Sequence, residues 1–146
     1  MAIQQFSQSL PIMLNRTLDA VMPRFRQIFR DAGLTEQQWR VLRVLWDQNE
    51  VTFREMANLT LIAPPSLVGV IDRLETRGLV SRRRSTTDRR AVDISLTAEG
   101  RGIERQVMPA VARAYAELKQ SVDPIVWQQL LAGLEQVTSA SQPKRR

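Results

Sequence analysis

Apolar residues return along most of this chain every three or four positions, which is the spacing of amphipathic helices. One stripe predicts a helix over residues 10–32, which Gly33 ends. A second helix is predicted to begin at Thr35, whose hydroxyl can cap the helix while Gln38 reaches back. The apolar residues that this second helix is expected to bury are Trp39, Leu42, Leu45 and Trp46.

Four further helices are predicted, at 52–60, 64–77, 97–120 and from 123 onward. Between the second and third of them the apolar positions alternate instead, with Val92, Ile94 and Leu96 between polar neighbours. This alternation predicts two strands, at 79–84 and 91–96. The fold class is therefore mainly α with a small β-wing, because a short helix, a second helix and a ribbon form a winged helix-turn-helix.

The second helix of such a motif lies in the major groove of DNA. Within helix 64–77 the positions Leu67, Val70, Ile71 and Leu74 share one face and are predicted to lie in the core. Small residues on the opposite face would let the backbone approach base edges, and an arginine there can pair with guanine or phosphate. The predicted DNA contacts are Pro65, Ser66, Val68, Gly69 and Arg73. A solvated helix face is the alternative.

The ribbon has five arginines between residues 81 and 90. A two-stranded hairpin is only marginally stable and crowded positive charge weakens it, so a polyanionic partner is expected. We assign Arg90 to the minor groove, Arg84 and Arg89 to phosphates, and Asp88 to the orientation of a guanidinium. An exposed charge run with its own ion pairs is the alternative.

Composition supports nucleic acid as the partner and disfavours catalysis. The 146 residues carry a net charge of +6, and 19 of the 21 basic residues are arginine, which suits phosphate and guanine. The absence of cysteine and histidine excludes thiol redox chemistry, disulfides, Cys/His zinc sites and histidine acid–base catalysis. We expect neither cofactor nor metal. The start MAIQQFSQSLPIMLNR lacks the pattern of a signal peptide, so a soluble, cytoplasmic protein without a membrane segment is expected.

Several short motifs resemble the signature of the MarR family of winged-helix transcription regulators. They are Leu34-Thr35 with Trp39, Leu42 and Leu45, then GLVSR at 78–82, Asp88-Arg89-Arg90, and LTAEG at 96–100. Within the family, LTEQQWRVLRVL at 34–45 and PSL at 65–67 are most similar to regulators of homoprotocatechuate and related aromatic-acid degradation operons.

The resemblance implies that residues 1–146 form one MarR-type unit. It also implies that two such chains form a homodimer, which binds a pseudo-palindromic operator in double-stranded DNA. Residues 10–33 and 98–140 would form the helical dimerisation lobe, and 34–97 the DNA-binding lobe. It also implies the wing roles of Asp88 and Arg90. A winged-helix adaptor for protein or RNA remains the alternative, and the salt dependence and sequence preference of DNA binding discriminate between the two.

Members of this family often release DNA when small phenolic or aromatic carboxylic acids bind, which implies an effector pocket. A cation for the carboxylate beside an aromatic and thioether wall would suit such a ligand. The candidates are Arg16, Met22, Phe25, Trp39 and Arg40. Trp39 and Phe25 as plain core residues, with both arginines solvated, are the alternative. The homoprotocatechuate-type pattern has an arginine where this chain has Pro64, so either another arginine meets the carboxylate or the ligand differs.

Overall fold

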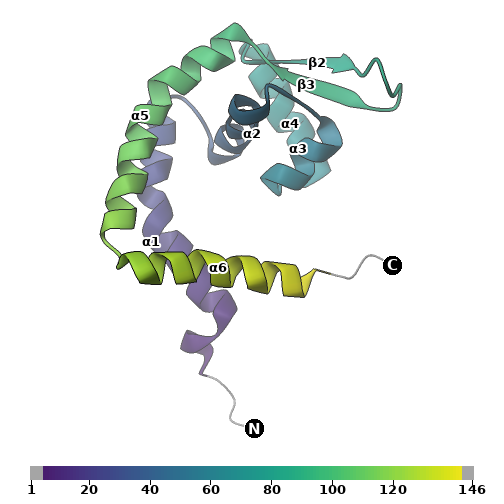
Figure 1. Cartoon of the computed structure of the whole chain (residues 1–146). Helices are drawn as coiled ribbons and strands as arrows, with labels where there is room; N and C mark the ends of the chain where they lie inside the picture. Colours follow the sequence, from purple (N-terminus) through teal and green to yellow (C-terminus); the bar gives the residue numbers. More distant parts are fainter. Residues whose placement is uncertain (1–4, 143–146) are drawn as a thin grey trace. The chain divides into compact units, whose positions relative to one another are not determined.

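The computed structural model describes residues 5–142 and is mainly helical (Figure 1). In chain order the elements are η1 (Phe6–Gln8), α1 (Leu10–Asp31), α2 (Glu36–Gln48), β1 (Glu50–Thr52), α3 (Phe53–Thr60), α4 (Pro64–Thr76), β2 (Val80–Arg84), β3 (Val92–Leu96), α5 (Ala98–Gln120) and α6 (Pro124–Ser141). The prediction of a mainly α fold with a small β-wing is confirmed.

Helix ends lie where the local chemistry predicts them. Thr35 and Thr52 both form capping boxes, in which the threonine hydroxyl accepts the backbone N–H three residues later and the side chain there accepts the N–H of the threonine. Gly33 and Gly78 have positive φ values of 69° and 72°, a backbone conformation that glycine adopts without strain. The two glycines thus follow the ends of α1 and α4, and the two threonines set the starts of α2 and α3.

The sheet has three strands, whereas the sequence predicts only the two of the ribbon. The order is β1-β3-β2, and every pair is antiparallel. β1 pairs Val51 with Ile94, and both side chains are buried. The prediction was incomplete because a three-residue strand between two helices is too short to show an alternating pattern, and only its tertiary partner β3 reveals it.

The core of the first half of the chain follows the predicted helix faces. Leu67, Val70, Ile71 and Leu74 of α4 are fully buried, as are Leu42 and Leu45 of α2. Trp39 is an exception, because it was expected in the core and is only partly buried. Its indole stacks on Phe29 with ring centroids 4.5 Å apart and meets Trp46 edge to face at 5.3 Å. An aromatic stack thus joins α1 to α2.

The motif LTAEG at 96–100 joins the wing to α5. Thr97 donates its hydroxyl proton to the carbonyl of Gly78, 2.6 Å away, and accepts the N–H of Gly100 at 3.1 Å. Trp46 Nε1 donates to the carbonyl of Gly100 at 3.0 Å. A Cβ at position 100 would lie 2.3 Å from the carbonyl oxygen of Leu79, so only glycine fits at this contact.

The chain divides into two compact units, Met1–Pro109 and Ala110–Arg146. Helices in both units expose large apolar side chains. In α1 they are Leu10, Met13, Leu14 and Leu18, and in α6 Ile125, Val126, Leu130, Leu131 and Val137. Soluble chains rarely leave so many apolar residues in contact with water unless a partner covers them. Among the described helices none combines the length and apolar character that a membrane span requires.

We predict that Gly100→Ala lowers the free energy of unfolding by about 1–3 kcal/mol, because the methyl group forces α5 away from Leu79. Urea denaturation measures this change. Gly102→Ala is the matched control, since the nearest atom to a Cβ there is Arg105 Nη2 at 4.0 Å. Equal stability of the two variants would contradict the steric role of Gly100.

Candidate nucleic-acid interface

The predicted DNA-contact face of α4 is open to solvent. Pro65, Ser66, Val68 and Arg73 are exposed, and Gly69 is partly exposed between them. Val68 has 45% of its surface exposed, which is high for a valine on a helix whose opposite face is buried. The sequence thus correctly separated the two faces of α4, because helical spacing alone sets them.

Gly69 also positions the side chain of Arg73. A Cβ at position 69 would lie 3.4 Å from Arg73 Nη1 and 3.9 Å from Cζ, so the guanidinium lies over the glycine. Since side chains on a helix lean toward its amino terminus, Arg73 is directed toward the end of α4 that carries Pro65 and Ser66. The missing methyl group at Gly69 leaves room for this arrangement.

The wing turn is built by side chains that bond its backbone. Ser85 Oγ accepts the N–H groups of Thr87 at 3.3 Å and Asp88 at 3.4 Å. Asp88 Oδ1 accepts the N–H of Arg90 at 2.9 Å, and the Asp88 carbonyl accepts the N–H of Ala91 at 3.0 Å. Such local bonds are the reason that serine and aspartate favour turns.

Asp88 therefore has a different partner from the expected one. We predicted that its carboxylate would orient a guanidinium, whereas the structure shows it bonded to the backbone of Arg90. Within residues 5–142 no ion pair involves Asp88. The carboxylate still determines where Arg90 lies, but it does so by fixing the main chain of the turn.

The five wing arginines fall into two groups. Arg82 pairs with Asp72 at 2.6 Å and Glu75 at 3.0 Å, and Arg83 pairs with Glu50 at 3.1 Å. The other three have no ion pair within the described part of the chain and are exposed; they are Arg84, Arg89 and Arg90. Internal ion pairs thus explain two arginines, and the three that we assigned to DNA lack such partners.

The bonds of the wing shift the pKa values of Glu75, Arg82 and Glu50. Hydrogen bonds from the Arg82 side chain lower the pKa of Glu75, and the same bonds raise the pKa of Arg82. A hydrogen bond from the Ser95 hydroxyl, followed by the charge of Arg83, lowers the pKa of Glu50. Each shift favours the charged form of the group.

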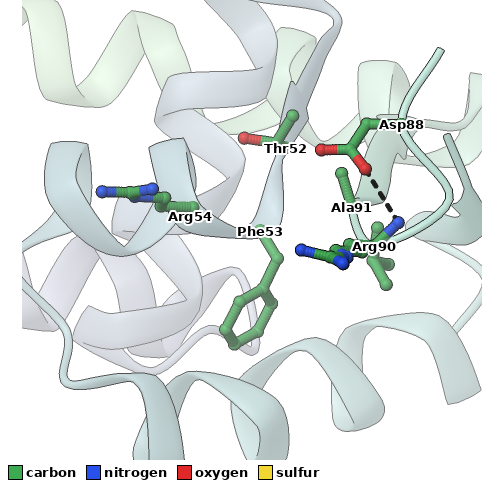
Figure 2. Close-up of a pocket in the computed structure, with 7 residues that line it drawn as sticks. Thr52, Phe53, Arg54, Asp88, Arg90 and Ala91 are labelled. Carbon is green, nitrogen blue, oxygen red and sulfur yellow. Dashed lines mark hydrogen bonds between the residues drawn. The ribbon is translucent and has the colours of Figure 1, made fainter.

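A hollow of about 500 Å³ lies between the start of α3 and the wing. Figure 2 shows Asp88 and Arg90 on its wing side, and Thr52, Phe53 and Arg54 on the side of α3. The sequence did not single out Phe53 or Arg54. No motif marks them, because they border this space only through the pairing of β1 with β3, which the alternation could not reveal.

The five candidate effector residues lie on α1 and α2. Arg16 is exposed on α1, about 9 Å along the helix axis from the partly buried Met22. Arg40 donates to Glu36 at 3.1 Å and to the carbonyl of Thr60 at 3.3 Å. A second hollow, of about 470 Å³, is lined by Ala116, Lys119, Gln120, Val122 and Pro124. None of the candidates lines either hollow, so their shared pocket stays a prediction.

The exposed face of α4, the basic wing and the buried core that α2, α3 and α4 share together define a winged-helix DNA-binding protein. The chain belongs to the MarR family. The pattern of that family matches residues 34–92, from the capped start of α2 to the first residue of β3. The resemblance of the sequence motifs to this family is thus confirmed.

Individual proteins extend the similarity over nearly the whole chain. The homoprotocatechuate degradative operon repressor of Escherichia coli is 36% identical over 128 residues, which cover 88% of this chain and 86% of that protein. NadR in complex with 4-hydroxyphenylacetate is 34% identical with a TM-score of 0.77, covering 92% of this chain and 97% of that one. CouR bound to a 23-mer DNA duplex is 29% identical with a TM-score of 0.82, covering 94% and 98%.

We predict that Gly69→Ala stabilises the fold and weakens DNA binding. Alanine should raise the free energy of unfolding by about 0.5–1 kcal/mol, while its methyl group contacts Arg73 and separates α4 from the bases. Urea denaturation and titration with a palindromic duplex selected by the protein from a random library (the selected operator) measure the two effects. Gly102→Ala is the control: it should raise the free energy of unfolding in the same way but leave the affinity for the selected operator unchanged. Unchanged affinity in Gly69→Ala would contradict a close approach of α4 to DNA.

Proposed function

We propose that this protein is a cytoplasmic transcriptional repressor that binds a pseudo-palindromic operator as a homodimer and acts without catalysing a reaction. The single observation that carries the proposal is that the three exposed wing arginines have no ion pair within residues 5–142, while the small-residue face of α4 is exposed as well. DNA phosphates supply the missing counter-charge. The repressor name of the relative from Escherichia coli and the DNA complex of CouR support this function.

The exposed apolar residues of α1 and α6 support the homodimer. A two-fold dimer would bury them and hold two recognition helices at a fixed span, as half-sites one DNA turn apart require. We therefore assign residues 10–33 and 98–140 to dimerisation and 34–97 to DNA binding. Each half-site of the operator would then be contacted by the three arginines of one wing.

Arg90→Ala should lower the affinity for the selected operator about 10- to 100-fold and leave the fold intact, because the wing loses its minor-groove contact. Fluorescence anisotropy at several salt concentrations measures the loss, and the salt slope should decrease by about one.

Arg43→Ala is the control for this variant. It removes one arginine of α2 whose side chain is 42% exposed and which belongs neither to the proposed DNA contacts nor to the residues assigned to dimerisation. The assignment of the wing is wrong if Arg90→Ala and Arg43→Ala bind the selected operator equally well.

We further propose that a small aromatic acid binds between α1 and α2 and releases the operator. The 4-hydroxyphenylacetate complex of NadR supports this ligand class. Arg40 is already bonded to Glu36 and Thr60, whereas Arg16 has no ion pair within the described residues. Arg16 is therefore the better candidate to bind the carboxylate. It would take the role of the arginine that the homoprotocatechuate-type pattern has at the position of Pro64.

Addition of 4-hydroxyphenylacetate at about 100 times its Kd should stabilise the fold by about 2.7 kcal/mol. Differential scanning fluorimetry detects the rise in Tm, and anisotropy detects release of the operator. Arg16→Gln should abolish both effects, and 4-hydroxyphenylacetamide, which lacks the carboxylate, should cause neither. If no member of a panel of aromatic acids raises the Tm, the effector proposal fails and the DNA-binding proposal is unaffected.

A further inference from the structure

Arg82 belongs to the basic wing, but its guanidinium bonds carboxylates of the chain itself. Its guanidinium bonds two carboxylates of α4, with Nη1 2.6 Å from Asp72 Oδ1 and Nη2 3.0 Å from Glu75 Oε1. Nε lies 3.3 Å from the same Glu75 oxygen. We refer to Asp72, Glu75 and Arg82 as the helix–wing clamp.

The clamp holds the main chain of the wing as well as its side chain. The backbone N–H of Arg82 donates to Glu75 Oε2 at 2.9 Å. β2 is an edge strand of the sheet, so this N–H has no partner strand and would otherwise face water. Glu75 thus bonds one point of β2 with both of its oxygens, which fixes the strand in position and in direction relative to α4.

The other paired arginine of the wing provides a contrast. Arg83 pairs with Glu50, and Glu50 also accepts a hydrogen bond from Ser95. These residues belong to β2, β1 and β3, so their bonds lie within the sheet. They stiffen the wing itself but do not connect it to α4.

We propose that the helix–wing clamp sets the angle between the wing and α4, so that both elements fit one DNA half-site at the same time. Arg82 and Glu75 are then positioning residues, and Arg82 does not contact DNA. This inference rests on the proposed function as a DNA-binding repressor. It adds a determinant of specificity that lies outside the contact residues.

The geometry explains why one clamp controls several contacts. Arg84 follows Arg82 on the same strand face, about 7 Å farther along β2. The turn with Arg89 and Arg90 lies beyond it, so a tilt of the strand at Arg82 displaces all three DNA-directed arginines together. Random DNA tolerates such a displacement because it attracts charge in any register, whereas an operator requires α4 and the wing to bind in register.

The first experiment preserves charge. Arg82→Lys keeps one positive charge but replaces the planar fork that bonds both carboxylates by a point charge. We expect the affinity for the selected operator to fall about tenfold, while the affinity for random duplex of equal length stays within about twofold. Arg83→Lys, the control, should keep both affinities. Operator affinity of Arg82→Lys equal to that of Arg83→Lys would overturn the proposal.

The second experiment changes charge equally at two places. Glu75→Gln and Glu50→Gln each raise the net charge by one. If charge alone mattered, both would bind all DNA more tightly. The clamp predicts instead that only Glu75→Gln loses preference for the selected operator over random duplex. Equal preference in the two variants would overturn the proposal.

A third measurement uses the protein without DNA, so it tests the helix–wing clamp independently of DNA binding. The chain has no cysteine, so Thr86→Cys provides a single site for a nitroxide label on the wing turn. We expect a more mobile electron paramagnetic resonance spectrum in Glu75→Gln than in Glu50→Gln, and identical spectra would overturn the proposal. If the wild type shows no operator preference, the proposed function fails, and the label still decides whether the clamp holds the wing.

Discussion

The close contact between Gly100 and the carbonyl of Leu79 is the constraint on which the winged-helix part of the chain depends. It brings the start of α5 against the chain between α4 and β2, and Trp46 of α2 bonds the same glycine. The end of α4, the beginning of β2 and the helix α2 thus all meet at Gly100. A single methyl group there would separate the elements that we propose to bind DNA together.

The same contact gives a physical meaning to the short motifs of the MarR family in this chain. Gly78 ends α4 with a positive φ, and its carbonyl accepts the hydroxyl proton of Thr97. Gly100 then permits close packing. GLVSR and LTAEG therefore form one contact, which explains why they occur together although the thirteen residues 83–95 of the wing separate them.

The arginines of the wing differ in whether the fold places a carboxylate next to them. Arg82 and Arg83 are neutralised by Asp72, Glu75 and Glu50, and these pairs hold the wing in shape and position. The remaining arginines stay exposed near its turn. The cost of crowding five like charges onto a small hairpin is thereby reduced, and the charge that remains is concentrated where a phosphate backbone can neutralise it.

Local chemistry in the sequence was sufficient to determine most of the secondary structure and the exposed face of α4. Capping boxes at Thr35 and Thr52 act within one helical turn, and the spacing from Leu67 to Leu74 needs no knowledge of other elements. The tertiary structure alone decided the rest: β1, the partners of Arg82 and Arg83, and the backbone bond of Asp88. Charge patterns in a sequence show how many arginines a wing has, but which of them remain free depends on carboxylates that folding brings from elsewhere in the chain.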